Sequence, residues 1–366
     1  MIYIVQPAIP KYRVGFFSEL LKSHSGGNIS FLSTEKDFLG VKSDISEIKQ
    51  HVVLTQGFYN VRKFIFWHKK LPLLQYEKDD IIVINGNPRV VNYMLLLFIC
   101  KLRGIKTIWW GHGWSAGSRG LFSKIRIKIM RFASAVLLYT DYEKEQIGIK
   151  NSSALNNGLD SSKIKDAIKI ANIERSYETS IKSLVFIGRL TEKAEFPFLL
   201  KVLSKTKYNC KLNVIGSGDK EAEFKKLAEE LSVAHRINWF GPLFDEVEIA
   251  KVMLSSHAFI YAGAVGLSLI HAFNYGLPAI IHDSREHHMP EFSAFLNEFN
   301  GLSFLCGDVV NAASTIDCLF SMPNDVQQEL SNNAKETVRH SYNIENMAQR
   351  FNQLITELTY NENTSN

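Results

Sequence analysis

The chain has 366 residues, of which 46% are hydrophobic and 22% charged, and its formal net charge is +5. This length fits two ordinary α/β domains better than one, and the composition excludes a largely disordered chain. The charge is modest, so its placement along the chain is more informative than its size. The four cysteines have no metal-site or redox-motif spacing, which favours buried reduced thiols, as in a reducing cytoplasm.

The N-terminus, MIYIVQPAIP, lacks a basic region followed by a long apolar stretch, so no signal peptide is predicted. The longest apolar run, near Tyr93 to Cys100, is about half of the ~20 residues that a membrane span needs. We therefore expect a cytoplasmic protein that reaches a membrane only by docking on its surface.

Short β-rich apolar runs alternate with helical patterns in the first half of the chain. In order, the sequence predicts a strand at 2–6, a helix beginning at 16–21, a strand at 81–85, a helix at 90–102, a strand at 107–110 and a helix-to-strand change over 132–139. Such alternation is typical of βαβ units with a parallel sheet. A polar stretch over 156–183 follows, and it predicts the linker between two domains.

The pattern restarts at Ser183. Predicted strands at 184–187, 211–215, 237–240, 258–261 and 279–282 alternate with predicted helices at 198–203, 220–231, 247–255 and 267–275. This order predicts a second Rossmann-like unit. A final helix near 344–358 has its apolar residues on one face, so we expect it to pack back across the domain junction.

Three loops that follow predicted strands of the second half are candidate anion sites, because ligands of open α/β sheets bind beyond the carboxyl ends of strands. The first loop contains Arg189 and Lys193, which together can grip a diphosphate. The second is Gly216-Ser217-Gly218, and the third runs from Gly263 to Leu267 into a helix that carries His271. The alternatives are a solvated basic loop, a plain turn and a buried structural histidine.

The segment Trp110-Gly111-His112-Gly113-Trp114 ends a predicted strand of the first half. Glycines on both sides leave the His112 imidazole uncrowded, so it can donate to a reacting group or take charge from it. The alternative is an ordinary loop histidine.

Two basic stretches carry interleaved apolar residues. The stretch 119–132 contains Lys124, Arg126, Lys128 and Arg131 with no acid, and a second stretch covers 62–70. Such segments can lie on an anionic lipid surface or bind RNA, and an ordinary helix with a basic outer face is the alternative.

Taken together, these loops resemble those of the retaining glycosyltransferases of family 4, which have the two-domain GT-B architecture. The similarity covers nearly the whole chain and is strongest over 183–308. Segments that match in order and spacing are 187–190, 215–218, 238–241, 266–278, 300–302 with 307–308, and 157–160 at the domain junction. The opening Ile9-Pro10-Lys11-Tyr12-Arg13 with Phe16-Phe17 resembles members that build bacterial surface polysaccharides such as O-antigen, capsule and lipopolysaccharide.

The resemblance implies an α/β fold with two Rossmann-like domains facing across a cleft. The expected N-terminal domain, 1–165, binds the acceptor, and the expected C-terminal domain, 166–342, binds the nucleotide sugar. The last helix, at about 343–360, is expected to pack on the first domain.

The resemblance also implies roles for single residues. Arg189 and Lys193 neutralise the donor diphosphate, His112 approaches the transferring sugar, and these three are the expected catalytic residues. The other expected donor contacts are Gly188, Gly216, Gly241, Leu243, Gly263, Ala264, Val265, Gly266, Leu267, His271 and Glu291. Residues expected to contact the acceptor or the membrane are Tyr12, Arg13, Lys124, Arg126, Lys128 and Arg131. No metal ion or other cofactor is expected.

The sequence departs from the family pattern in three ways. The family usually has two glutamates eight positions apart where this chain has Gly263 and His271. Lys193 follows Arg189 by four residues rather than five, and Lys11 to Gly15 replaces the usual Gly-Gly loop near the N-terminus. We expect Glu291 to replace a lost carboxylate.

The predicted function is transfer of a sugar, with retention, from a nucleoside-diphosphate sugar to a glycan or lipid-linked acceptor at the inner membrane surface. The competing hypotheses are a non-catalytic partner subunit with the same fold and a nucleic-acid-binding protein. A sugar-nucleotide epimerase shares the architecture but fits the motifs from Gly188 onward less well.

Overall fold

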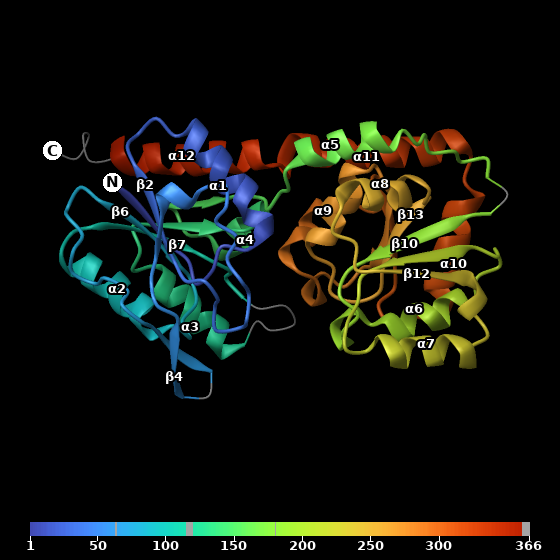
Figure 1. Cartoon of the computed structure of the whole chain (residues 1–366), viewed down its shortest axis with the longest axis horizontal. Coiled ribbons are helices and arrows are strands. Elements are labelled where there is room, and N and C mark those ends of the chain that lie inside the picture. The colour runs from blue at the N-terminus through green and yellow to red at the C-terminus, as the bar shows by residue number, and fades with distance from the viewer. Residues whose placement is uncertain (63, 115–119, 180, 361–366) are drawn as a thin grey trace. The chain divides into compact units, whose positions relative to one another are not determined.

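The computed structural model describes residues 1–62, 64–114, 120–179 and 181–360. The chain forms two compact units (Figure 1). Unit 1 comprises Met1–Leu159 together with the C-terminal segment that begins at Ile344, and unit 2 comprises Asp160–Asn343. No helix in the described ranges is long and apolar enough to cross a membrane.

Unit 1 is built on a parallel sheet whose described strands lie in the order β3-β2-β1-β6-β7-β8-β9. They are β1 (Ile2–Val5), β2 (Ile29–Ser33), β3 (Val52–Leu54), β6 (Ile81–Asn85), β7 (Lys106–Trp110), β8 (Ala135–Leu138) and β9 (Ser152–Ala154). A separate antiparallel hairpin pairs β4 (Phe58–Arg62) with β5 (Ile65–His68). The strand order reverses between β1 and β6, as in a doubly wound sheet.

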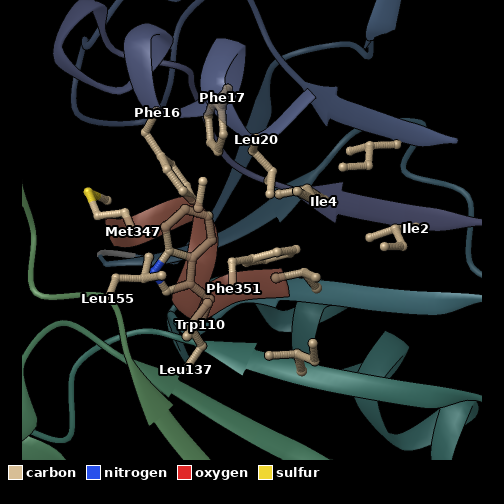
Figure 2. Close-up of a cluster of buried hydrophobic side chains, with 14 of the residues drawn as sticks. Ile2, Ile4, Phe16, Phe17, Leu20, Trp110, Leu137, Leu155, Met347 and Phe351 are labelled. Atoms are coloured by element: carbon tan, nitrogen blue, oxygen red, sulfur yellow. The ribbon is translucent and has the colours of Figure 1, made fainter. Parts of the chain in front are cut away.

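Both faces of the unit 1 sheet are buried, which explains why its strands read as continuous apolar runs. The helices of the unit are α1 (Lys11–Ser23), α2 (Val91–Leu102), α3 (Leu121–Met130), α4 (Asp141–Ile147) and α12 (Ile344–Tyr360). Helices α1 and α12 cover one face, where Phe16, Trp110 and Phe351 meet in a single cluster (Figure 2). Helices α2 and α3 and the hairpin cover the other face.

Unit 2 has a parallel sheet in the order β12-β11-β10-β13-β14-β15 within the described chain. Its strands are β10 (Ser183–Ile187), β11 (Lys211–Ile215), β12 (Ile237–Gly241), β13 (Ala258–Tyr261), β14 (Ala279–His282) and β15 (Gly301–Phe304). Its helices are α5 (Ser161–Ala171), α6 (Phe196–Leu203), α7 (Glu221–Glu230), α8 (Glu246–Leu254), α9 (Leu267–Asn274), α10 (Val309–Ser321) and α11 (Asn324–Ser341). The order reverses between β10 and β13, so the switch point of a Rossmann sheet lies there.

Short 3-10 segments complete the chain: η1 (Lys49–His51) in unit 1, and η2 (Glu192–Ala194), η3 (Ala234–Arg236), η4 (Arg285–His287) and η5 (Pro290–Ala294) in unit 2. The prediction of an α/β fold with two Rossmann-like units is confirmed.

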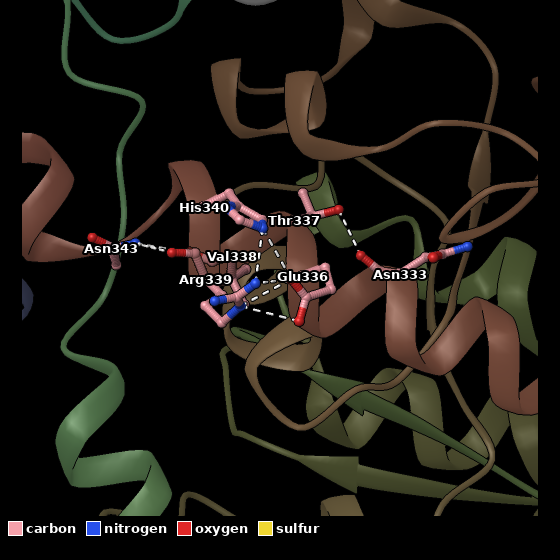
Figure 3. A network of polar contacts seen from close by, with 7 residues as sticks. All are labelled: Asn333, Glu336, Thr337, Val338, Arg339, His340 and Asn343. Atoms are coloured by element: carbon pink, nitrogen blue, oxygen red, sulfur yellow. Dashed lines mark hydrogen bonds and ion pairs between the residues drawn. The ribbon is translucent and has the colours of Figure 1, made fainter.

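The last turn of α11 is closed by side chains before the chain passes into α12 (Figure 3). The Asn343 amide donates to the carbonyl oxygens of Val338 and Arg339, at 3.1 and 2.7 Å. The Val338 oxygen also accepts from the backbone amide of Tyr342, so Asn343 adds a second donor there and supplies a donor to the Arg339 oxygen at the end of the helix. One turn earlier, Glu336 accepts hydrogen bonds from Arg339 on the surface.

The predicted linker over 156–183 is wrong for most of its length. Asp160 caps α5 by accepting a hydrogen bond from the Ser162 amide, and the helix packs on α8 through buried residues that include Ile164. The boundary therefore lies between residues 159 and 160, six residues before the expected 165/166. The polar residues over 161–171 are the outer face of an amphipathic helix rather than part of a solvated linker.

Beyond α5, Arg175 anchors the stretch to unit 2. Its buried guanidinium donates to the backbone carbonyl oxygens of Met253, Ser256, Tyr275 and Gly276. A charged group that is satisfied by so many acceptors fixes the chain around it in place.

Candidate functional site

The loops after β10 and β11 lie side by side at the carboxyl edge of the unit 2 sheet. The Gly188 amide donates to the Ile215 carbonyl oxygen, and the Leu190 amide donates to the Ser217 carbonyl oxygen, both at 3.0 Å. The loop after β13 joins them, because the Ala264 amide donates to the Lys193 carbonyl oxygen at 3.3 Å. The fold thus brings the three sequence-predicted anion loops together at the switch point.

Glycines are required where these loops touch. A Cβ atom on Gly216 would overlap the Gly188 carbonyl oxygen, and one on Gly263 would overlap the Lys193 carbonyl oxygen. Gly218 is restricted in the same way by Leu190. We expected the space left by the missing side chains of Gly216 and Gly218 to admit a ligand. This expectation is corrected, because neighbouring backbone occupies that space at both glycines.

Arg189 and Lys193 are both exposed on this edge. Lys193 lies in η2. Arg189 follows β10 and lies near Tyr261: burial raises the pKa of Tyr261, and the positive charge of Arg189 opposes this shift. Neither cation has an ion-pair partner among the described residues. Two positive charges without ion pairs at a switch point are suited to binding a diphosphate.

The backbone of the β13 loop is largely committed to the fold. The Ala264 amide is bonded to Lys193, and the Val265 amide donates to His288 Nδ1 at 3.2 Å. The Val265 side chain is fully buried. The expected donor contacts from the amides of Ala264 and Val265 are thus corrected. Gly266 is the N-cap residue of α9, and its carbonyl oxygen accepts from the Leu269 amide at 2.9 Å, whereas the amides of Leu267 and Ser268 have no acceptor within the helix.

Two stacked histidines hold this loop, and sequence reasoning missed both. The rings of His282 and His288 lie 3.8 Å apart with an interplanar angle of 17°. His282 Nδ1 accepts from the Ser284 amide, and His288 donates from Nε2 to the His282 carbonyl oxygen. Burial lowers the pKa of His282 to about 4 and that of His288 to about 3, so both rings are neutral at physiological pH.

His271 is paired with a carboxylate that the sequence pattern did not reveal. Its Nε2 lies 2.6 Å from Glu246 Oε1, and the Tyr275 hydroxyl donates to the same oxygen at 2.6 Å. Burial raises the pKa of Tyr275, and this hydrogen bond raises it further by a smaller amount. Glu246 begins α8 and precedes His271 by 25 positions, so no local motif connects the two residues.

The remaining predicted donor contacts of unit 2 lie around the same edge. Glu291 is buried, with Oε2 3.6 Å from the point where a Cβ atom of Gly266 would lie. The Gly241 carbonyl oxygen accepts from the Gly216 amide at 2.8 Å, which brings the end of β12 to the glycine loop. Leu243 follows two residues later and is half-buried.

In unit 1, His112 follows β7 and is held on two sides. Its ring centroid lies 4.0 Å from that of Tyr139, and its Nδ1 lies 3.5 Å from Glu143 Oε1. The flanking Gly113 is needed for packing, because a Cβ atom there would overlap the Ile147 side chain. His112 is thus an oriented imidazole with one third of its side chain exposed, at 34%.

The unit 1 residues expected to contact the acceptor or the membrane divide into two groups. Tyr12, Lys124, Lys128 and Arg131 are exposed. Arg13 is buried, with its guanidinium over the Trp110 and Tyr139 rings. The Arg126 guanidinium is partly buried: burial lowers its pKa, and the charge of Glu143 opposes this shift. The expected membrane contact of Arg13 and Arg126 is therefore corrected. Residues 115–119, which include the start of the basic stretch, lie outside the described residues, as does Lys63 of the second stretch.

Residues 169–337 match the family model of the group 1 glycosyl transferases. This group 1 segment contains all the predicted donor contacts of unit 2, while His112 and the basic residues of unit 1 lie before it. The resemblance to glycosyltransferases seen in the sequence is confirmed for this segment.

A curated relative, an uncharacterized glycosyltransferase of Methanocaldococcus jannaschii, is 25% identical over 173 residues, which are 46% of this chain and 43% of the relative. The match thus spans less than half of that protein.

Solved structures resemble the whole chain. The lipopolysaccharide outer core galactosyltransferase WaaB has a TM-score of 0.70 at 17% identity and covers 97% of this chain and 99% of its own. Anabaena Alr3699/HepE in complex with UDP has a TM-score of 0.70 at 13% identity with the same coverage. A glycosyltransferase of Rickettsia africae has a TM-score of 0.70 at 16% identity and covers 98% of both chains. At such identities the likeness shows a shared fold.

Proposed function

We propose that this protein transfers a sugar from a nucleoside-diphosphate sugar, with retention, to a glycan or lipid-linked acceptor in surface polysaccharide synthesis. One observation carries the proposal: Arg189 and Lys193 are exposed, without ion-pair partners in the described ranges, at the switch point of a segment that matches the group 1 glycosyl transferases. The UDP complex of the similar Anabaena structure supports a nucleotide donor.

In this reaction the site must stabilise a leaving nucleoside diphosphate. The bond between the anomeric carbon and the phosphate oxygen breaks, the acceptor oxygen bonds to that carbon from the same face, and the acceptor proton passes to the leaving phosphate. Arg189 and Lys193 offset the charge that develops on the phosphate, and the fold holds the reactants in position. In this proposal the positive charge comes from side chains and helix amides, and no metal ion is invoked.

The nucleoside contacts follow from the same edge of unit 2. The ribose hydroxyls are assigned to two carboxylates near this edge: Glu246, which is paired with His271, and Glu291, which lies beside Gly266. The base is assigned to the end of β12, from Gly241 to Leu243. His112 of unit 1 is assigned to the transferring sugar.

Replacement of Arg189 by Ala tests the proposal. Loss of a preorganised charge contact to the leaving group typically costs about 10²–10³ in turnover. We expect Arg189→Ala to lower kcat/KM by that factor in a transfer assay, while Lys226→Ala, which removes an exposed cation on α7, leaves it unchanged. Wild-type turnover by Arg189→Ala would contradict the assignment.

The acceptor side of the proposal is a membrane surface, and the charge distribution of unit 1 supports it. From Ile81 to Thr140 the sequence has no Asp or Glu and nine Lys and Arg. The layer formed by α2, α3 and the β4–β5 hairpin also exposes large apolar side chains: Tyr59, Val61, Phe64, Val91, Leu95, Phe98, Leu102, Leu121, Phe122 and Ile125. Basic and apolar groups on one layer are suited to anionic lipid headgroups and the upper acyl region.

Vesicle flotation tests this surface. We expect binding to vesicles that contain anionic phosphatidylglycerol, and weaker binding as salt is added, because the Debye length shortens. Lys124→Glu with Lys128→Glu should abolish flotation, whereas the matched pair Lys201→Glu with Lys205→Glu in unit 2 should not. The absence of binding at low salt, or equal effects of the two pairs, would argue against a lipid surface.

A further inference from the structure

Glu143 is a buried carboxylate whose two oxygens contact different parts of unit 1. It is the third residue of α4, is 2% exposed, and its own amide donates to Thr140 Oγ1 at 3.2 Å. Its Oε2 accepts from the Tyr139 amide at 3.2 Å, which resembles an ordinary helix-capping contact. Its Oε1 instead reaches 30 residues back along the chain to accept from the Gly113 amide at 3.3 Å.

The Oε1 atom also lies 3.5 Å from His112 Nδ1, and helix capping does not require this contact. A carboxylate at this edge of an imidazole attracts the ring proton to Nδ1. The second nitrogen, Nε2, is then left with its lone pair. Burying a carboxylate is costly unless it is paired, so the contacts to Gly113, Tyr139 and His112 and the charge of Arg126 are needed to hold it there.

The face of the imidazole is fixed as well as its edge. The Tyr139 ring lies against it at 4.0 Å with an interplanar angle of 36°. Tyr139 is braced by the buried Arg13 guanidinium, whose central carbon lies 5.3 Å from the Tyr139 ring centre and 4.7 Å from that of Trp110. Stacking sets the plane of the His112 ring and Glu143 sets its rotation, so one nitrogen is presented in one direction.

We infer that Glu143 is a positioning residue that keeps His112 in the Nδ1-protonated tautomer, so that Nε2 accepts a hydrogen bond from a hydroxyl of the transferring sugar. The sugar contact rests on the proposed function, whereas the tautomer does not. Glu143 touches no substrate and acts only through His112. No motif in the sequence indicated Glu143.

The first test reads the tautomer without any substrate. Long-range ¹H–¹⁵N correlation spectra of the full chain should show His112, assigned by the loss of its signals in His112→Gln, with the proton on Nδ1. Glu143→Ala should shift it to the Nε2-protonated form that free imidazole side chains prefer. Thr140→Ala, which removes the cap of the same helix without touching Oε1, should lower thermal stability and leave the tautomer unchanged. An unchanged tautomer in Glu143→Ala would overturn the inference.

The second test is a double-mutant cycle in the transfer assay. Glu143→Gln should lower kcat by about tenfold to hundredfold, as residues that orient a reacting group do, with little change in the donor KM. In a His112→Ala background the same replacement should have no further effect, because its target is gone. Additive losses would show a merely structural role and overturn the inference. If the protein transfers no sugar at all, the proposed function fails, while the spectra still decide the tautomer.

Discussion

The Cβ atom of an alanine at position 263 would overlap the carbonyl oxygen of Lys193. Because backbone cannot yield as a flexible side chain does, Gly263→Ala should displace the Lys193 loop and destabilise unit 2 by about 1–3 kcal/mol. Urea unfolding measures the effect. Gly57→Ala in unit 1 is the matched control, since nothing lies within 4 Å of its Cβ position, and equal stability of the two variants would contradict this account of Gly263.

Some single site residues, Gly263 among them, could be predicted from the sequence, and others could not. Arg189, Lys193 and Gly263 could be found because each lies in a loop that follows a predicted strand. Glu246, Glu143 and His288 could not, because their partners come from other elements and only the fold brings the pairs together. The sequence also suggested that Arg13 and Arg126 face solvent, because a basic residue in an amphipathic stretch is normally exposed.

At the scale of the element, α12 binds the C-terminal end of the chain into the unit 1 core. Phe351 is fully buried, and its ring lies 6.5 Å from that of Phe16 on α1. Phe351→Ala should therefore cost roughly 3–5 kcal/mol of unfolding free energy, as large-to-small core changes do. Gln353→Ala, on the exposed face of the same helix, should change it by less than about 0.5 kcal/mol. A small effect of Phe351→Ala in equilibrium unfolding would show that α12 is only loosely attached.

Elements with strong periodicity were predictable, and elements with weak or mixed patterns were not. Strands β6, β10 and β11 stand out as buried apolar runs. The hairpin β4–β5 escaped prediction because β4 is largely exposed, and α5 escaped because Lys and Ser cover its outer face. In both cases tertiary contacts, rather than local pattern, decide the structure.

At the scale of the whole molecule, buried histidines make folding sensitive to acid. Burial lowers the pKa of His68, His257 and His282 to about 4 and that of His288 to about 3. In the unfolded chain these side chains take up protons at their ordinary pKa of ~6.5, so the unfolded state binds more protons as pH falls below that value. Stability should be complete above about pH 6.5 and decrease steadily toward pH 4, by roughly 1–3 kcal/mol per histidine.

Urea unfolding at pH 7.5, 6.5, 5.5 and 4.5 measures this dependence. Because three of the four histidines belong to unit 2, the loss should be larger there than in unit 1, with unchanged denaturant slopes. Stability that stays constant between pH 6.5 and 4.5 would contradict the neutral, buried state of these rings.

The two-unit α/β architecture could be predicted because βαβ alternation recurs twice along the chain. The junction could not be placed correctly, since the contacts of α5 and Arg175 are long-range. The segment that matches the group 1 glycosyl transferases lies in unit 2, where the predicted motifs were densest.

Thermal stabilisation by a panel of UDP, GDP, dTDP, CMP and the corresponding sugar nucleotides tests the central claim most directly. A ligand at a hundred times its dissociation constant adds about 2.7 kcal/mol to the folded state. We predict a clear shift with one base, which names the donor class, and its loss in both Arg189→Ala and Lys193→Ala. The absence of a shift with every nucleotide, from a folded sample, would contradict a donor site in unit 2 and favour a non-catalytic partner subunit.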